Sequence, residues 1–384
     1  MKKYFSEEHL MLKQMVSEFA EKEIKPFAQE IDSKSQFPRD IIDKMSKLGL
    51  LGIPWDEKYG GIGMDTLSLV IAIEEIAKVC TSTAVTMMAH TSLGSGPIAY
   101  FGTDQQKQKY LTQLAKGKIL GAFGLTEPNA GSDAGNTQTT AELKDNFYLI
   151  NGQKSFCTNA GESGIITITA KILNKDSSKE NIGAFIVDSD SKGVNFGSPE
   201  KKMGWKGSDT RAVFFENVKI PKTNILGDPE KGFSQFLETL SGGRITIGGL
   251  SLGIAQGAFN AAAKYSKERE AFGKEINKFQ GVSFKISDMA TRIEAAKHLV
   301  YHAAWLKDNK LPFIKEAAMA KLFSSETAMY VTTEAIQIHG GYGYIKEYNV
   351  ERYFRDAKIL EIGEGTSEIQ RIVISREILN NLNI

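Results

Sequence analysis

The chain has 384 residues, of which 41% are hydrophobic and 24% charged, and its formal net charge at pH 7 is +1. This length exceeds one ordinary hydrophobic core, so two or three packed units are expected, and the composition excludes disordered and fibrous classes. The near-neutral charge also argues against a nucleic-acid surface, which normally carries a clustered basic excess.

The N-terminal stretch Met1–Glu8 is charged from its start, and no apolar segment of the signal-peptide type follows it. No uninterrupted apolar run reaches the length of a bilayer span. Cys80 and Cys157 lie far apart without paired spacing, so we expect buried thiols and neither a disulfide framework nor a zinc site. These features predict a soluble cytoplasmic protein without membrane insertion.

Residues 1–118 are predicted to form an N-terminal helical domain. Apolar residues recur there at helical spacing, and Ser6 and Asp104 are interpreted as helix starts. Glycine and proline clusters at 60–63 and 94–97 divide the pattern into several helices and loops.

Residues 119–230 are predicted to form a middle β-domain. The runs 147–150, 165–170 and 184–187 are short and rich in β-formers, and Asn151-Gly152 is interpreted as one of the turns between them. Because no long helical pattern lies between these runs, an antiparallel sheet is expected rather than βαβ units. Helical periods return in residues 231–384, most clearly over Val282–Lys307 and Phe313–Ile338, so the fold class is α+β.

Common cofactor and metal fingerprints are missing from the sequence. Neither the glycine fingerprint of a Rossmann site nor that of a P-loop is found. His298 and His302 have a metal-compatible spacing, but no third ligand accompanies them, so no metal site is expected.

A loop dense in small residues follows the first predicted strand, over Gly124–Gly135. Its backbone N–H groups could approach a phosphate or a flavin ring, although the local chemistry fits a plain surface loop equally well.

A second glycine-rich region, Gln337–Tyr344, ends a long helix, and its glycines permit close backbone approaches. Further on, Ser367 and Gln370 have the spacing of a capping box, so the last helix is expected to begin near Glu368. Glu364 then lies on the turn before that helix, between two glycines, where it faces either a bound ligand or water.

These residues resemble the acyl-CoA dehydrogenase family over essentially the whole chain. Gly124–Gly135 is similar to the first family signature, with a single departure at Asn136, and Gln337–Asp356 fits the second throughout. The stretch Leu306–Lys321 is similar to the short-chain (butyryl-CoA) branch. The resemblance implies an N-terminal helical domain, a middle antiparallel β-domain and a C-terminal four-helix bundle. It also implies a homotetramer, a dimer of dimers that binds FAD partly across a subunit interface.

The resemblance further implies site residues. Phe123, Leu125 and Thr126 are expected beside the flavin, where Phe156 covers the ring and Thr158 bonds it, while Arg269, Phe272 and Gln280 reach FAD across the interface. Further FAD contacts are implied at Gly131, Ser132, Gln337, Gly340, Gly341, Thr366 and Glu368. Substrate contacts are implied at Ser132, Ser241, Arg244, Gly363 and Gly365.

Glu364 is expected to be the catalytic base that removes the α-proton of an acyl-CoA. Some members carry the carboxylate at the position that is Gly243 here, which leaves Glu364 as the base. Gly242 and Gly243 together cost a helix about 2 kcal/mol, so the backbone is expected to lie close to another group, for which the substrate is the candidate.

The predicted function is therefore dehydrogenation of a short- or medium-chain acyl-CoA, with or without a methyl branch, to the trans-2-enoyl-CoA in fatty acid β-oxidation. Electrons would pass to an electron-transferring flavoprotein. The alternatives are an acyl-CoA oxidase, which uses oxygen, and a non-catalytic flavin-binding relative that binds a partner.

Overall fold

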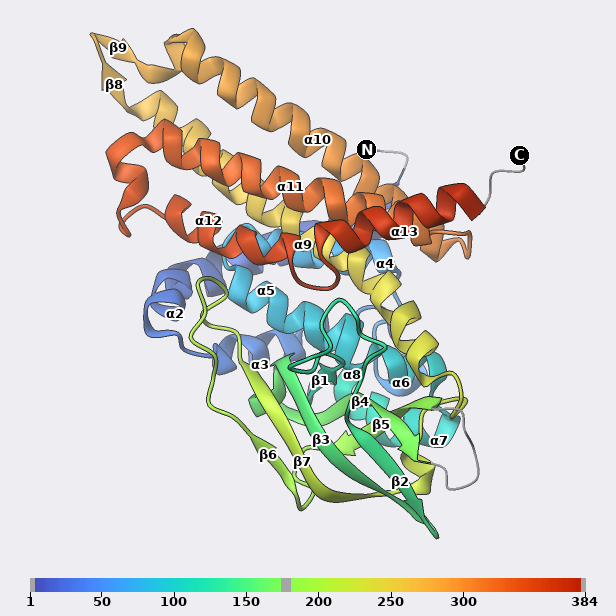
Figure 1. Cartoon of the computed structure of the whole chain (residues 1–384). Helices are drawn as coiled ribbons and strands as arrows, with labels where there is room; N and C mark the ends of the chain where they lie inside the picture. The colour runs from blue at the N-terminus through green and yellow to red at the C-terminus, as the bar shows by residue number, and fades with distance from the viewer. Residues whose placement is uncertain (1–3, 174–180, 381–384) are drawn as a thin grey trace.

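The computed structural model describes residues 4–173 and 181–380, so Met1–Lys3 of the N-terminal stretch lie outside it. Helices precede and follow a β-region in the chain, as predicted, and the sheet lies at one end of the molecule (Figure 1). The helix α9 (Gly232–Glu268) runs from the sheet to the opposite end of the helical region (Figure 1). Within the described ranges, no helix combines the length and the apolar character that crossing a bilayer requires.

The N-terminal helices surround a buried centre. Every residue of α4 is buried, because the helix packs between α1 on one side and α9 and α10 on the other. Both predicted helix starts are confirmed, since Ser6 caps α1 in a capping box with His9, and α7 begins at Asp104 with Thr103 as its cap. The helices are α1 (Glu7–Phe19), α2 (Ala28–Lys34), α3 (Arg39–Lys47), α4 (Thr66–Ala77), α5 (Thr81–Met88), α6 (Gly96–Phe101), α7 (Asp104–Gln106) and α8 (Thr112–Ala115), with a π-helical segment η5 (Ala89–Gly94) after α5.

The middle region is a mixed sheet, which corrects the expectation of a purely antiparallel one. Its strand order is β1-β4-β2-β3-β7-β6, with β5 beside β4. β1 and β2 both pair with β4 in parallel, and the other pairs are antiparallel. Parallel neighbours need a crossover, and the β2–β3 hairpin supplies it here without an α-helix. The strands are β1 (Leu120–Gly124), β2 (Thr140–Lys144), β3 (Phe147–Thr158), β4 (Ser163–Leu173), β5 (Asn181–Asp188), β6 (Val194–Phe196) and β7 (Thr210–Pro221).

The interpretation of Asn151-Gly152 as a turn is wrong, because both residues lie inside β3. Gly152 has a φ of +144° beside a register shift between β3 and β7, which is a β-bulge. A Cβ there would stand 2.6 Å from the Thr139 Cα, so the close approach of a neighbouring backbone requires the glycine. The β2–β3 turn instead includes Asp145, whose φ is +47°.

The C-terminal region is a bundle in which α11 packs against α9, α10 and α13, as the resemblance implied. Its hydrophobic core continues into the N-terminal helices, since Leu250 and Ala328 share one buried cluster with Ile73. The elements are α9, a small hairpin of β8 (Glu270–Ala271) and β9 (Lys274–Glu275), α10 (Gln280–Asp308), α11 (Ile314–His339), α12 (Val350–Lys358) and α13 (Ser367–Asn380).

A buried ion pair fixes the loop that follows β1. The Lys154 ammonium is fully buried and donates to the Glu127 carboxylate at 2.7 Å. The same carboxylate accepts the backbone N–H groups of Gln138 and Thr139. Burial alone would raise the pKa of Glu127, but the Lys154 charge and these hydrogen bonds outweigh it and lower that pKa. The pair therefore ties both ends of the Glu127–Thr139 loop to β3.

We predict that Lys154→Met lowers the free energy of unfolding by about 3 kcal/mol or more, because it leaves the Glu127 carboxylate buried and unpaired. The matched control is Lys144→Met, which breaks a half-exposed pair with Glu142 and changes stability by less than about 1 kcal/mol. Thermal melting of both variants beside the wild type measures the difference. Equal melting temperatures for the two variants would contradict the role given to Lys154.

Candidate active site

The turn Gly363–Gly365, just before α13, holds Glu364 in a conformation that side chains rarely adopt. The φ of Glu364 is +53° and that of Gly365 is +90°. Two buried side chains stabilise the turn through one carbonyl, since Lys321 Nζ and Gln370 Nε2 each donate to Gly365 O at 2.8 Å. The turn is thus held from α11 and from α13.

The capping box predicted for Ser367 and Gln370 is wrong. α13 begins at Ser367, and the side chain that caps it is Thr366, whose Oγ1 accepts from Ile369 N at 3.3 Å. Ser367 Oγ is buried without a hydrogen-bond partner among the described residues. The Gln370 amide is used instead to hold the Glu364 turn.

The Glu364 carboxylate lies against α9, at Gly243. A Cβ on Gly243 would stand only 2.3 Å from Glu364 Oε2 and 3.3 Å from the Leu93 side chain of η5. A Cβ on Gly242 would meet the Lys307 Nζ at 3.0 Å. The close approach expected at these glycines is therefore made by side chains of the same chain. A carboxylate on residue 243 would compete with Glu364 for this space.

At least one oxygen of the Glu364 carboxylate is shielded from water. The residue is half-buried, and Oε2 is buried and has no hydrogen-bond partner in the described part of the chain. Burial raises the pKa of Glu364 to about 7, although the charges of Lys321 and Arg244 act to lower it. The effect of burial on the pKa therefore exceeds that of the two positive charges. An unpaired carboxylate with this pKa can accept a proton near neutral pH.

Arg244 stands near this carboxylate on α9. The side chain is buried, its Nη1 is 3.5 Å from Ser241 Oγ, and its Nε has no hydrogen-bond partner within the described residues. Ser241 is also buried. The structure thus gathers the five residues predicted near the acyl group, Ser241, Arg244, Gly363, Glu364 and Gly365, around one point of α9, with Thr366 and Glu368 directly after them.

A second group of predicted residues comes together on the sheet. Ser155 N donates to Thr126 O at 2.8 Å, which brings the loop after β1 beside the end of β3. Phe156 stands there at a β-bulge with a φ of +55° and 66% of its surface exposed. Phe123 stacks on Phe236 of α9, with 4.3 Å between ring centroids. The end of β3 thus carries an exposed aromatic ring beside the loop after β1, where Leu125 is buried, and Thr158 at the end of the strand is half-buried.

The loop itself leaves room for a ligand. Gly131 and Ser132 are exposed, and a Cβ on Gly131 would meet nothing within 4 Å. An exposed ring, free loop space and a buried unpaired carboxylate fit a planar cofactor with phosphate groups and an apolar substrate. These observations agree with the flavin expected from the sequence.

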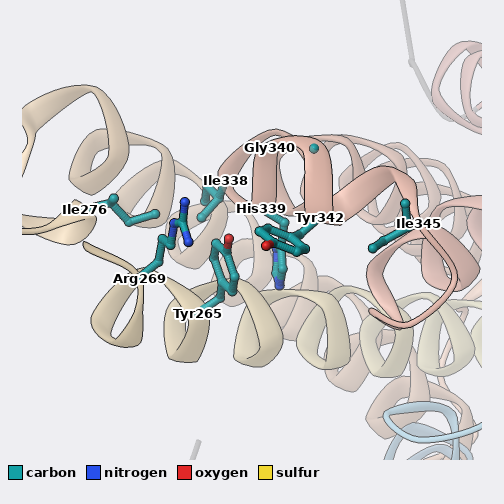
Figure 2. A pocket seen from close by; sticks show the side chains of 9 residues that line it. Tyr265, Arg269, Ile276, Ile338, His339, Gly340, Tyr342 and Ile345 are labelled. Atoms are coloured by element: carbon teal, nitrogen blue, oxygen red, sulfur yellow. The ribbon is translucent and has the colours of Figure 1, made fainter. Parts of the chain in front are cut away.

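The third group lies at the other end of α9. Arg269, Gly340 and Gly341 line a cavity of about 450 Å³, in which Arg269 stands over the Tyr342 ring and Tyr265 stacks on His339 (Figure 2). Ile276, Ile338 and Ile345 complete its lining. Nearby, Gln280 begins α10, Gln337 is in the last turn of α11, and both are exposed.

The second and third groups do not meet within one chain. α9 has 37 residues, and at 1.5 Å per residue it spans about 55 Å. Its first residue, Gly232, contacts the β5 backbone, and its last precedes the β8–β9 hairpin that carries Phe272. Phe272 is 95% exposed at that hairpin. One chain therefore presents two separate parts of the expected cofactor site.

Lys321 and Gln370 were not predicted as site residues from the sequence. Lys321 lies on the buried face of α11 between Ala317 and Ser324, and a lysine among such small residues on a buried helix face could have indicated a functional role. Gln370 was assigned to a helix cap, so its contact with the turn was overlooked. The histidines considered for metal binding make other contacts, because His298 pairs with Glu294 and His302 stacks on Trp305. Among described residues, no group of three or more His, Cys, Asp and Glu has a metal-binding arrangement.

Three family domains match the chain in order. The acyl-CoA dehydrogenase N-terminal domain matches residues 6–118, the middle domain 122–218 and the C-terminal domain 230–379. The chain belongs to the acyl-CoA dehydrogenase family.

Similar proteins cover almost the full length of this acyl-CoA dehydrogenase. It is 52% identical to the probable acyl-CoA dehydrogenase YngJ of Bacillus subtilis, over 97% of this chain and 98% of the relative. It is 49% identical to the short-chain specific acyl-CoA dehydrogenase of Clostridium acetobutylicum, with the same coverage. A chain of the solved structure "Electron transferring flavoprotein of Acidaminococcus fermentans: Towards a mechanism of flavin-based electron bifurcation" superposes with a TM-score of 0.96 and 49% identity, over 98% of this chain and 99% of that one.

We predict that Gly243→Ala slows flavin reduction by acyl-CoA about tenfold to a hundredfold, because the new methyl group displaces the Glu364 carboxylate. Stability should not fall, since the displaced atom ends a flexible side chain and alanine favours the helix. Gly242→Ala is the matched control, because its methyl group meets the movable end of Lys307. Stopped-flow reduction and thermal melting measure both effects, and equal rates for the two variants would contradict the placement.

Proposed function

We propose that this acyl-CoA dehydrogenase oxidises the Cα–Cβ bond of an acyl-CoA with Glu364 as the base that takes the α-proton. The observation that carries the proposal is the Glu364 carboxylate, whose Oε2 is buried, unpaired and aimed at α9. A structural carboxylate would be hydrogen-bonded when buried, whereas a base needs a free oxygen for the incoming proton.

Removal of the α-proton from the thioester has two requirements that the chain must meet. The α-proton is weakly acidic, so the carbonyl must be polarised while a base reaches the α-carbon. The backbone N–H of Glu364 is the proposed donor to that carbonyl, and the nearby Arg244 adds positive charge. Exclusion of water strengthens both interactions and raises the pKa of Glu364 above that of an ordinary carboxyl group. FAD, when bound, accepts the hydride that leaves the β-carbon.

The cofactor contacts are proposed from three parts of the chain. Leu125, Thr126, Phe156 and Thr158 would hold the flavin, with Phe123 behind them and Gly131 and Ser132 near the phosphates and the CoA. Thr366 and Glu368 would lie on the diphosphate side. Arg269, Phe272, Gln280, Gln337, Gly340 and Gly341 would contact the adenosine side of a cofactor held by another copy.

Support for a second copy comes from the length of α9. Arg269 cannot reach a flavin at Thr126 of its own chain when about 55 Å of helix separates the two ends. The exposed Phe272 would also lose its contact with water in an assembly. A homotetramer built as a dimer of dimers would join the two half-sites.

The proposed electron acceptor is an electron-transferring flavoprotein, the protein after which the similar solved structure is named. An acyl-CoA oxidase would instead pass electrons to oxygen, and a non-catalytic relative would pass none. Reoxidation rates with oxygen and with the flavoprotein separate the first two, and bleaching by acyl-CoA excludes the third. A cytoplasmic location and a role in fatty acid β-oxidation stay predictions of the sequence.

The proposed substrate is a short or medium monocarboxylic acyl-CoA, and the short-chain specific relative supports this class. Glutaryl-type members of the family carry an arginine in the segment that corresponds to 83–101, where it pairs with the distal carboxylate. This chain has no arginine there, so a dicarboxylic substrate is not expected. Gly363 stands immediately before the base, where short-chain members commonly carry tyrosine. The missing phenol leaves space that an α-methyl group could fill.

We predict that Glu364→Gln retains FAD and binds acyl-CoA but reduces flavin about a thousandfold more slowly than the wild type. The amide is nearly isosteric, so the binding contacts survive while the proton acceptor is lost. Anaerobic stopped-flow bleaching with butyryl-CoA measures the rate. Near-normal reduction would place the base on another residue.

We predict that Gly363→Tyr lowers kcat/KM for 2-methylbutyryl-CoA and isobutyryl-CoA about tenfold more than for butyryl-CoA. A Cβ at residue 363 fits at 3.5 Å from the nearest atom, Ile359 O, so the added ring and not the backbone causes the loss. Gly363→Ala is therefore the matched control. The panel also includes hexanoyl-, octanoyl- and glutaryl-CoA. If glutaryl-CoA is the best substrate, or the tyrosine variant accepts branched chains as the wild type does, the pocket argument fails.

A further inference from the structure

Lys321 is a fully buried cation in the first half of α11. Its Nζ donates to Gly365 O at 2.8 Å, and the residues beside it on the buried face of the helix are small. Burying an ammonium group is unfavourable unless other groups offset the lost hydration. One hydrogen bond to a neutral carbonyl offsets only part of it.

The same carbonyl has a neutral donor as well, because Gln370 Nε2 also lies 2.8 Å from Gly365 O. A carbonyl oxygen accepts two hydrogen bonds, so the two donors do not exclude each other. Gln370 alone would still leave the carbonyl satisfied. The hydrogen bond therefore explains the position of Lys321 but not its charge.

The Glu364 carboxylate is the group on which the Lys321 charge can act. Lys321 donates a hydrogen bond to Gly365, the residue after Glu364, so its ammonium faces the turn that carries the base. Glu364 Oε2 has no hydrogen-bond partner among the described residues, so the cation acts on the carboxylate without occupying it. The other charged groups around Lys321 are Arg244 on α9, Glu361 before the turn and Glu368 on α13, while Arg376 of α13 acts on Arg244.

Resting on the proposed function, we propose that Lys321 is a positioning residue for the catalytic base. Its hydrogen bond to Gly365 holds the turn that aims Glu364 at α9, and its charge favours the ionised form of the carboxylate that must accept the proton. Because no bond joins the ammonium to Oε2, the carboxylate stays free to take a proton.

The direction of the shifts agrees with this arrangement. Burial lowers the pKa of Lys321 to about 8, while the nearby Glu364 acts to raise it. Burial raises the pKa of Glu364 to about 7, and Lys321 opposes that rise more strongly than Arg244 does. Loss of the Lys321 charge therefore raises the pKa of Glu364 further. At low pH more of the carboxyl group is then protonated, and activity falls there.

The test is the pH profile of kcat/KM for flavin reduction in the holoenzyme, whose acid limb reports the base of the free enzyme. In Lys321→Met we expect this limb to move upward by about one pH unit. The rate should then fall about tenfold at pH 6 and much less at pH 9, where the base is ionised in both proteins. Lys321→Gln, which retains a donor but no charge, should show the same displacement.

Gln370→Met is the matched control, because it removes a hydrogen bond to the same carbonyl without removing a charge. We expect its rate to fall by a similar factor at every pH, with the limb unmoved. If Lys321→Met and Lys321→Gln give profiles that are parallel to the wild type, Lys321 only holds the backbone and the inference is overturned. Flavin content and melting temperature, measured on each variant, identify any that fails to fold.

Infrared titration of the oxidised holoenzyme gives a second readout that needs no turnover. The carboxyl band absent from Glu364→Gln reports the ionisation of Glu364 directly, and Lys321→Gln should move its midpoint upward. If Glu364→Gln reduces flavin normally, the proposed function itself fails. If that variant is inactive but the band in Lys321→Gln does not move, only the role of Lys321 fails.

Discussion

The site depends on the burial of one carboxylate against the backbone of α9. Glu364 Oε2 occupies the space that a side chain on residue 243 would need, so that position must be glycine while Glu364 holds this place. To reach it, Glu364 adopts a positive φ, which costs about 1–3 kcal/mol and persists only when surrounding contacts enforce it. Lys321 and Gln370 supply those contacts from two helices. The helix, the turn and the two buried side chains thus act as one unit.

α9 also sets the plan of the molecule. Its start touches β5, its first third carries Gly243 and Arg244 beside Glu364, and its end leads into the β8–β9 hairpin. Because the helix spans about 55 Å, one chain carries the residues predicted beside the flavin near the sheet and a separate glycine-lined cavity at the far end of α9. The assembly proposed above would bring these two regions of neighbouring copies together.

The helices and strands that follow from the local pattern of apolar and polar residues could be predicted from the sequence. The long helical periods of α10 and α11 and the β-rich runs of β3, β4 and β5 appear where expected, because side-chain periodicity records which face is buried. The parallel pairing of β1 with β4 was not predictable in this way, since a hairpin supplies the crossover. Gly152 was misread as a turn because the neighbour that requires glycine, Thr139, is distant in sequence. For the same reason the sequence pointed to Glu364 but not to Lys321, whose contact with the turn exists only in the folded chain.

The central claim is that Glu364 removes the α-proton, and it can be tested apart from the redox step. Acetyl-CoA offers α-protons but no β-hydrogen, so the enzyme can exchange its protons without oxidising it. Deuterium uptake from D₂O at pH 8, followed by proton NMR, should be catalysed by the wild-type holoenzyme and fall to the uncatalysed background in Glu364→Gln. Exchange at the wild-type rate in that variant would contradict the account.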